Sequence, residues 1–374
     1  IILNDAKSLG GGVFDSEYFN GVNPSTFTYE DRDYDRVRKR VFLNLGMEYY
    51  FNDETSLTIS GFTRNSDNLS NNSTIIQDLD QNKEILNEFG RFQDEEEDDI
   101  SSQLTLNYTK KFNKKGHELV IEFQTEESTE DESDYASNTN TFDQSSMTDE
   151  TQLRKLLQLD YVYPIDKNTQ FELGYRGNFS DLNTDYKVLD IRGNETKRNS
   201  NLSNIFNFNQ DVNAYYTQFG KKINQFSYLL GLRAETTNLQ INQKTSQVSN
   251  KKKYTDLFPT VNLSYEFSNS ENITLGYSRR IRRPSSWSLN PFQSITSLTF
   301  FRQGNPDLDP SYSNSYDLGY LKRIKKFTLS GSIYFQKETD VIQRITEETG
   351  EIVRVSENPV AVSYTHLRAH ETSD

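Results

Sequence analysis

Two runs of carboxylates are the part of this sequence best suited to holding a metal ion. The first covers Asp94 to Asp99 without interruption, and the second places six acidic residues between Glu126 and Asp134. Carboxylate oxygens are the ligands that Ca²⁺ prefers. Neither run has the D-x-[DN]-x-[DN]-G spacing of an EF-hand loop. We therefore interpret both runs as solvated loop charge and expect no metal site.

Residues suited to covalent chemistry are few. His117 is the only histidine before residue 362, because His366 and His370 both lie in the last thirteen residues. Cysteine is absent, and the sequence has no G-x-S-x-G, P-loop or Rossmann motif. The run Gly10–Gly12 has neither a strand pattern before it nor a helix pattern after it, which indicates a loop. We predict no catalytic residue, no cofactor and no enzymatic activity.

Composition narrows the class of protein. The net charge of −14 excludes a nucleic-acid partner, since phosphate binding needs clustered Lys and Arg. The mean hydropathy of −0.81 is low, yet the chain has 24 Phe and 22 Tyr. A β-barrel in a membrane reconciles the two values, because each strand needs only every second residue to be apolar. No run approaches the roughly 18 apolar residues of a spanning helix.

The strands that would position any functional residue show as hairpins with alternating polarity. In 260–278, Val261, Leu263, Tyr265 and Phe267 alternate with polar residues before a short turn, and the pattern then resumes. Similar hairpins surround short turns at 113–116, 165–168 and 324–326, with weaker ones near 37–64 and 207–237. We predict strands of about ten residues. We expect long loops near 66–98, 128–149, 181–205, 239–254 and 284–311.

This rhythm predicts an all-β fold, a partial antiparallel transmembrane β-barrel of about a dozen strands. A soluble β-sandwich or β-solenoid is the alternative, because any half-buried strand alternates in the same way. Aromatic residues at strand ends, such as Tyr49, Tyr50 and Phe51, favour the barrel because they match the girdles found at membrane interfaces.

The segment 278–310, SRRIRRPSSWSLNPFQSITSLTFFRQGNPDLDP, has the most specific pattern in the chain. It resembles the TonB-dependent receptor barrel of Bacteroidetes type, in the outer membrane protein β-barrel family. The resemblance extends more loosely over residues 30 to 358. The matching residues are Arg282, Arg283, Pro284, Trp287, Leu289, Asn290, Pro291, Phe292, Gly304, Asn305, Pro306, Leu308 and Pro310.

This resemblance implies a function and partners. The protein would take up a scarce nutrient through the bacterial outer membrane, in contact with outer-membrane lipid. It would receive energy from the TonB system through an N-terminal region with a plug domain, which is not visible in this sequence. About 22 strands are typical of such barrels. The ligand and the residues that bind it stay open.

Three other functions remain as alternatives. They are a passive plugless channel, a soluble extracellular β-rich adhesin or glycan binder, and, as the least favoured, a barrel enzyme. The motif segment itself has two interpretations. Pro284 lacks a ladder donor and ends a strand, so we prefer a structural strand-to-loop corner. The other interpretation is a folded loop that packs over the lumen or contacts ligand.

The two ends of the sequence carry separate expectations. IILNDAKSLGGGVF has no signal-peptide features, and we interpret it as a break inside a longer protein. Residues 362–374, VSYTHLRAHETSD, resemble a translated adapter from sequencing libraries. We therefore divide the chain into a partial outer-membrane β-barrel domain, 1–361, and a non-native tail, 362–374.

Overall fold

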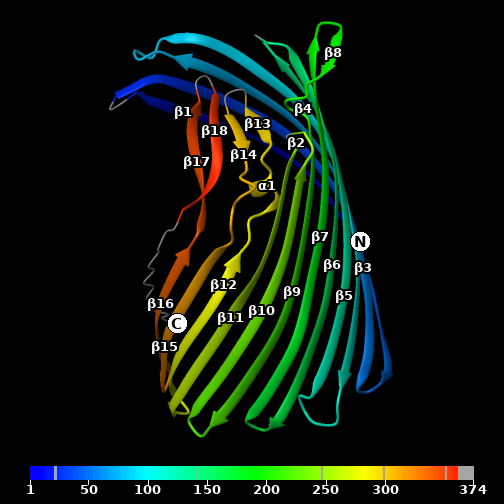
Figure 1. The fold of residues 1–374 in the computed structure, drawn as a ribbon, viewed down its shortest axis with the longest axis vertical. Helices are drawn as coiled ribbons and strands as arrows, with labels where there is room; N and C mark the ends of the chain where they lie inside the picture. Colours follow the sequence, from blue (N-terminus) through cyan, green and yellow to red (C-terminus); the bar gives the residue numbers. More distant parts are fainter. Residues whose placement is uncertain (21–22, 140, 246, 298–299, 350–351, 361–374) are drawn as a thin grey trace.

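The chain folds into one large antiparallel sheet, seen in a computed structural model that describes residues 1–20, 23–139, 141–245, 247–297, 300–349 and 352–360 (Figure 1). The sheet has 14 strands, of which 13 follow one another in chain order and β8 pairs only with β7. The strands are β1 (Ile2–Asn20), β2 (Asn23–Asn52), β3 (Thr55–Leu79), β4 (Ile85–Lys111), β5 (Glu118–Asn138), β6 (Asp143–Asp166), β7 (Thr169–Arg192), β8 (Glu195–Arg198), β9 (Asn204–Ile223), β10 (Phe226–Gln243), β11 (Val248–Ser268), β12 (Glu271–Arg282), β15 (Ser311–Ile324) and β16 (Phe327–Thr339).

This sheet curves into an open wall, and smaller elements lie near one of its ends (Figure 1). A second sheet has four strands in the order β13 (Gln293–Ser297), β14 (Phe300–Gln303), β18 (Ile352–Val360) and β17 (Val341–Thr349). The helix α1 (Ser286–Leu289) is a single turn. Among the described residues, no helix is long and apolar enough to cross a membrane. The predicted tail, 362–374, lies outside the described residues.

The predicted fold class and the short turns are confirmed, and the loop predicted near 284–311 is the connection between β12 and β15. The other four predicted loops, near 66–98, 128–149, 181–205 and 239–254, are wrong, because most of their residues belong to strands. β2 runs for 30 residues, β3 for 25 and β4 for 27, well beyond the ten expected. The span 66–98 is a hairpin joined at 80–84, and most of 128–149 belongs to β5 and β6. The polar composition of these spans led to the error. A ladder of backbone hydrogen bonds does not need apolar side chains, so a strand in water continues with polar residues on both faces.

The acidic runs are corrected in the same way, because they lie on strands and not in loops. The run 94–99 is part of β4, and 126–134 is part of β5. The two runs pair with each other in register, with Glu97 opposite Glu132 and Asp98 opposite Asp131. Alternation then divides each run between the two faces of the sheet.

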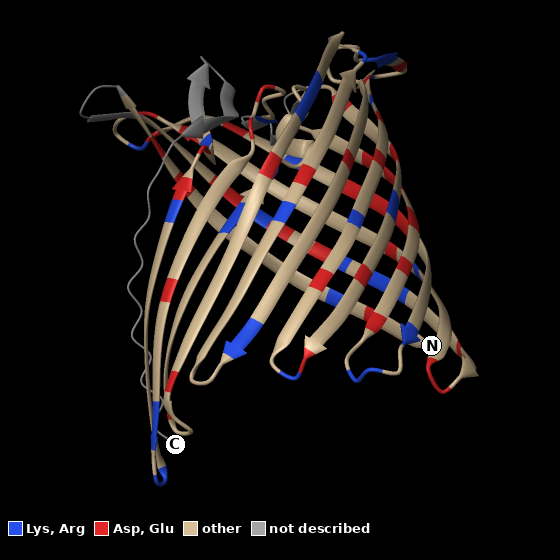
Figure 2. Ribbon diagram, turned by 60° about the horizontal axis from the view of Figure 1, so that its bottom comes forward, with Lys and Arg blue, Asp and Glu red and all other residues tan. Residues whose placement is uncertain are grey.

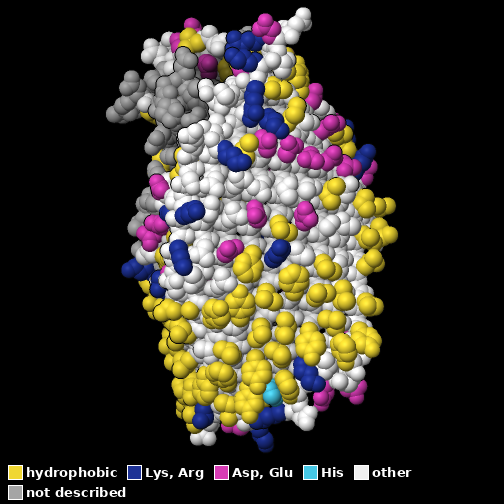
Figure 3. Space-filling view, turned by 45° about the vertical axis from the view of Figure 1, so that its right-hand side comes forward, with side chains coloured by type: hydrophobic (Ala, Val, Ile, Leu, Met, Phe, Trp, Pro, Cys, Tyr) yellow, Lys and Arg dark blue, Asp and Glu magenta, His cyan; other side chains and the backbone are white. Residues whose placement is uncertain are grey.

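The outer face carries an apolar belt next to the short turns (Figure 3). On β11, every second residue from Leu257 to Phe267 is apolar, and Val261 and Leu263 pair with Leu230 and Tyr228 of β10. Ten residue steps of ~3.3 Å on a strand tilted by ~40° give a belt about 25 Å high, which matches the apolar band of membrane barrels.

A row of aspartates marks the upper limit of the belt. These residues are Cα partners from β3 to β7, on the same outward face as the belt; they are Asp67, Asp98, Asp131, Asp149 and Asp185. Acidic side chains also gather above the hydrophobic ones in Figure 3. Charge facing lipid is costly, so the wall leaves the membrane below this row.

Candidate functional site: the segment folded over the inner face

The segment between β12 and β15 folds onto the inner face of the wall. Ser285 is the N-cap of α1, and its Oγ accepts a hydrogen bond from the Ser288 amide at 3.4 Å. Leu289 at the end of α1 and Leu308 on the returning limb are 0% and 1% exposed. They pack in one cluster with side chains of β7, β9 and β10, which are Leu182, Phe206, Phe208, Leu239 and Ile241. The segment is therefore a folded unit with its own small core.

Arg283 fastens the start of this segment to β10. Its guanidinium donates to Glu235 at 2.5 Å and to the Thr237 hydroxyl at 3.1 Å. Glu235 is only 7% exposed and also accepts a bond from Arg233 at 2.5 Å. A buried carboxylate needs such partners, because an unpaired charge in this environment is strongly destabilising.

Gly304 and Asn305 hold the two limbs of the segment together. The Gly304 amide donates to the Asn290 carbonyl, and the Asn305 amide donates to the Ser288 carbonyl, each at 2.8 Å. A Cβ at Gly304 would lie 2.4 Å from the Ser288 carbonyl oxygen. Only glycine allows this approach of two backbones.

The returning limb is fastened to β11. Lys252 donates to the carbonyls of Asp307 and Leu308 at 2.7 and 2.9 Å, and to the Asp309 carboxylate at 2.8 Å. Asn250 donates to the Pro306 carbonyl at 2.9 Å. Sequence reasoning missed Lys252 and Asn250, because they come more than 50 residues before their partners.

The other motif residues differ in exposure. Pro284 and Pro310 are buried, and the Pro291 carbonyl accepts a bond from Gln303 at 2.7 Å. The Phe292 ring lies 6.4 Å from that of Tyr186. Trp287 stays 49% exposed, with Arg302 5.4 Å from its ring centroid. The segment packs over the inner face, which is more than the simple strand-to-loop corner that we preferred from the sequence. Its contact with a ligand stays a prediction.

Arg282 does not join this unit. It ends β12 opposite Ser311 and is exposed, beside a cavity of about 210 Å³. The structure thus brings the predicted residues from Arg283 to Pro310 together and leaves Arg282 at the edge.

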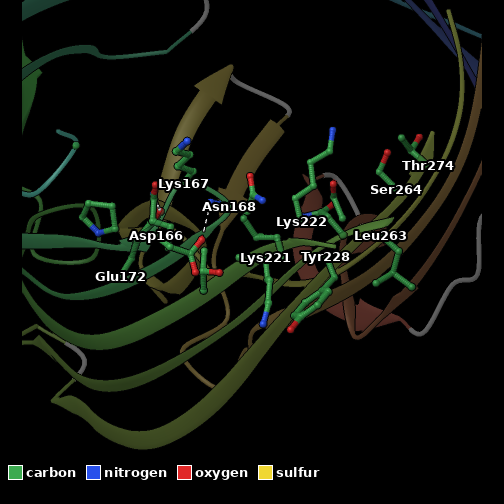
Figure 4. A pocket seen from close by; sticks show the side chains of 18 of the residues that line it. Asp166, Lys167, Asn168, Glu172, Lys221, Lys222, Tyr228, Leu263, Ser264 and Thr274 are labelled. Carbon is green, nitrogen blue, oxygen red and sulfur yellow. Dashed lines mark hydrogen bonds between the residues drawn. The ribbon is translucent and has the colours of Figure 1, made fainter. Parts of the chain in front are cut away.

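A larger hollow of about 1290 Å³ lies at the opposite end of the wall, near the short turns of β7 and β9–β12 (Figure 4). Lys167, Lys221 and Lys222 lie on its rim with Asp166, whose carboxylate accepts a bond from the Asn168 amide at 2.7 Å. The hollow is larger than a typical small-molecule pocket of ~300–1,000 Å³.

The histidine and the acidic side chains of the described ranges form no metal site. His117 stacks on Phe112 at 4.0 Å and shares a hydrogen bond of 2.9 Å with the Tyr161 hydroxyl, so it belongs to the aromatic residues near a turn. Within the described ranges, no group of three His, Asp or Glu side chains is arranged to hold a metal ion.

An antiparallel sheet with an apolar outer belt, a polar inner face and a segment folded over that face defines the wall of an outer-membrane β-barrel. The sequence profile of the outer membrane protein beta-barrel family matches residues 110–364, and the chain belongs to this family. Its place is the bacterial outer membrane. No curated protein matches the chain by sequence.

Solved structures share the fold at low sequence identity. The copper transporter OprC is 11% identical, with a TM-score of 0.56 over 96% of this chain and 56% of that one. The Serratia marcescens hemophore receptor HasR, solved as a double mutant with its hemophore HasA and heme, is 9% identical, with a TM-score of 0.54 over 95% of this chain and 58% of that one. The chain thus spans less than two thirds of either protein.

Proposed function

We propose that the chain is the barrel part of a TonB-dependent outer-membrane receptor that imports a nutrient with energy from the inner membrane. The observation that carries the proposal is the segment 283–310, which is fastened by Arg283 and Lys252 over the inner face above the belt. A passive pore needs an open path, whereas a receptor needs a structured surface in that path. OprC is a transporter and HasR is a receptor, and their shared fold supports the same choice.

TonB contact is the partner interaction to test. The complete reading frame, expressed in outer membranes and purified in detergent, is passed over an immobilised TonB C-terminal domain. We expect retention of the protein, and loss of retention when the region upstream of residue 1 is deleted. A full-length protein that is not retained, or a reading frame without an upstream plug, would overturn energy coupling.

A passive channel is the second candidate, favoured by the 1290 Å³ hollow at the turn end. Planar-bilayer recording of the full-length protein separates the two functions. A receptor closed by a plug gives no steady conductance, while an open channel gives stable steps that scale with salt. The soluble adhesin does not agree with the apolar belt, because a belt of this height in water would leave a large apolar patch exposed.

A further inference from the structure

Four neighbouring strands place their charges in columns on the inner face. We name the following residues the charge array. They form an arginine column on β2 (Arg36, Arg38, Arg40), a neutral column on β3 (Ser70, Asn68, Ser66), and acidic columns on β4 (Glu95, Glu97, Asp99) and β5 (Asp134, Glu132, Glu130). Each row is in register across the four strands. Figure 2 shows both acidic and basic residues along the strands of the wall.

The spacing of the array follows from sheet geometry. Neighbouring strands lie ~4.8 Å apart, so the arginine column and the first acidic column are about 10 Å apart. Within a column, successive side chains are two residues, or about 7 Å, apart. The array lies above the belt, since Asp98 and Asp131 of the outer aspartate row alternate with its acidic members.

The arginines of the array donate hydrogen bonds to neutral side chains and form no ion pair within the described ranges, although Arg36 attracts the Glu95 carboxylate across the neutral column. Arg36 donates to the Ser70 hydroxyl at 3.3 Å, Arg38 to the Asn68 amide oxygen at 2.7 Å, and Arg40 to the Ser66 hydroxyl at 3.3 Å. All three are exposed. A guanidinium has five donors, and each of these bonds uses one of them. The neutral column therefore separates three positive charges from the carboxylates.

The carboxylates, in turn, have too few cations. Asp99 pairs with Arg64 at 2.6 Å, but Glu97 lies opposite Glu132, and Asp134 has a buried oxygen without a hydrogen-bond partner. Like charges that face each other across strands are destabilising. Burial, followed by the neighbouring carboxylates, raises the pKa of Glu130 and of Glu132 to about 7.

A small cavity opens at the lower edge of the array. It has a volume of about 180 Å³, and four carboxylates and two guanidiniums line it together with neutral side chains. The charged residues are Arg64, Asp99, Glu126, Glu130, Glu150 and Arg154. A cationic end group of a ligand would thus find a negative net environment there, about 14 Å, or three strand spacings, from the arginine column.

We propose that the charge array binds an amphoteric ligand, with its anionic group on the arginine column and its cationic group on the acidic columns. A short peptide with both charges has this chemistry. Such a ligand places an anionic group next to the arginine column and a cationic group next to the acidic columns. A ligand with charges of one sign would be repelled by one of these columns. This proposal rests on the receptor function proposed above and names its ligand class.

Binding is tested with purified full-length protein in detergent micelles. The probes are blocked pentapeptides, Glu-Ala-Ala-Ala-Lys, Glu-Ala-Ala-Ala-Glu and Lys-Ala-Ala-Ala-Lys, whose two charged side chains lie on the same side of an extended chain, about 14 Å apart. By isothermal titration, we expect the mixed peptide to bind at least about tenfold more tightly than either like-charged peptide. Equal affinities, or no binding of the mixed peptide, would overturn the proposal and leave the array to a segment of the longer protein.

Variants then locate the binding. R36Q/R38Q/R40Q and E95Q/E97Q/E132Q should each weaken binding of the mixed peptide by about tenfold or more. The matched controls Lys39→Gln and Asp98→Asn/Asp131→Asn change charges on the same strands but on the outer face, and should alter affinity less than about twofold. Controls that weaken binding as much as the array variants would contradict the site. Heat-modifiable gel mobility verifies folding, and the wild-type peptide comparison holds without any variant.

The two proposals can fail separately. Peptide binding in micelles needs no TonB, so loss of TonB retention with intact peptide selectivity overturns only energy coupling. Retention on TonB with no peptide selectivity overturns only the charge array.

Discussion

The lower and upper parts of the wall have the same backbone ladder but opposite side-chain rules. In the lower part, Leu257 to Phe267 of β11 alternate strictly, because one face meets lipid and the other a polar interior. In the upper part, β4 and β5 place carboxylates on both faces and in direct opposition. The backbone hydrogen bonds therefore accept any type of side chain. Whether a face meets lipid or water decides which residues are found on it.

A charged residue on the lipid-facing side of the belt should cause the largest loss of stability. Leu263→Arg lies near the middle of the belt and should destabilise the full-length protein by up to about 4 kcal/mol. Its neighbour on the inner face, Asn262→Arg, should cost less than about 1 kcal/mol. Urea unfolding in lipid vesicles measures both values.

An outward-facing arginine above the belt should, in contrast, leave the stability of the protein unchanged. Asp98→Arg lies between Asp67 and Asp131, so it replaces two repulsions with attractions. We expect unchanged or slightly higher stability in the same assay. A loss comparable to that of Leu263→Arg would show that lipid reaches the aspartate row.

The segment 283–310 lies in the upper part of the wall and is anchored there to the buried carboxylate of Glu235. Substitution of Arg283, which pairs with this carboxylate, should therefore destabilise the segment. Arg283→Met leaves Glu235 with Arg233 alone, which should cost about 3 kcal/mol, the lower end for a broken buried pair. Hydrogen exchange should rise in 283–310 and not in the belt. Arg282→Met is the matched control, because that side chain is exposed; equal effects would show that Arg283 does not anchor the segment.

Gly304→Ala tests the backbone contact of this segment. The new Cβ meets the Ser288 carbonyl oxygen, and separating the two limbs should cost about 2 kcal/mol, as overpacking does in cores. Gly193→Ala provides a comparison, since its φ of +60° strains the backbone while nothing lies within 4 Å of the added Cβ. Faster exchange of the Asn305 amide only in Gly304→Ala would confirm the cause.

The lower part of the wall was predictable from the sequence, whereas the upper part was not. Alternation at Val261, Leu263 and Tyr265 reports a lipid face directly, and the short turns follow from it. Above the belt no apolar signal remains, so the acidic runs were interpreted as loops. The missing information is how far the strands continue, because the predicted turn at 113–116 sets the register that places Glu97 opposite Glu132, whereas polar composition does not reveal that β4 and β5 extend that far.

The motif segment shows the same limit. Pro284 was visible as a local signal that ends a strand, and Gly304, Asn305 and Pro306 were visible as part of the family motif. Their anchors Glu235, Asn250 and Lys252 lie on strands distant in sequence, and only pairing brings them near. The arginine column was also missed, although Arg36, Arg38 and Arg40 at alternate positions already indicate one face of a strand.

The smallest expected effect is a dependence of stability on pH, which should appear in the upper part of the wall and not in the belt. The pKa of Glu130 and Glu132 is raised to about 7 by burial and by neighbouring carboxylates, from an ordinary value of 4.5. The folded state therefore holds protons that the unfolded state has released between pH 4.5 and 7. Stability from this source is complete below about 4.5 and is lost as the pH rises through about 7.

Hydrogen exchange, corrected for its intrinsic pH dependence, measures this loss of stability strand by strand. Upper β4, β5 and β6 should open more readily at pH 7.5 than at pH 5.5, because Glu95, Glu97, Asp99 and Glu150 then repel the newly charged pair across partly buried strands. The belt, whose outer face carries no such cluster, should not respond. In Glu130→Gln/Glu132→Gln the difference should shrink, because two of the titrating groups are gone. A belt that responds equally would mean that the two parts open as one cooperative unit, and that their opposite side-chain rules do not divide the wall energetically.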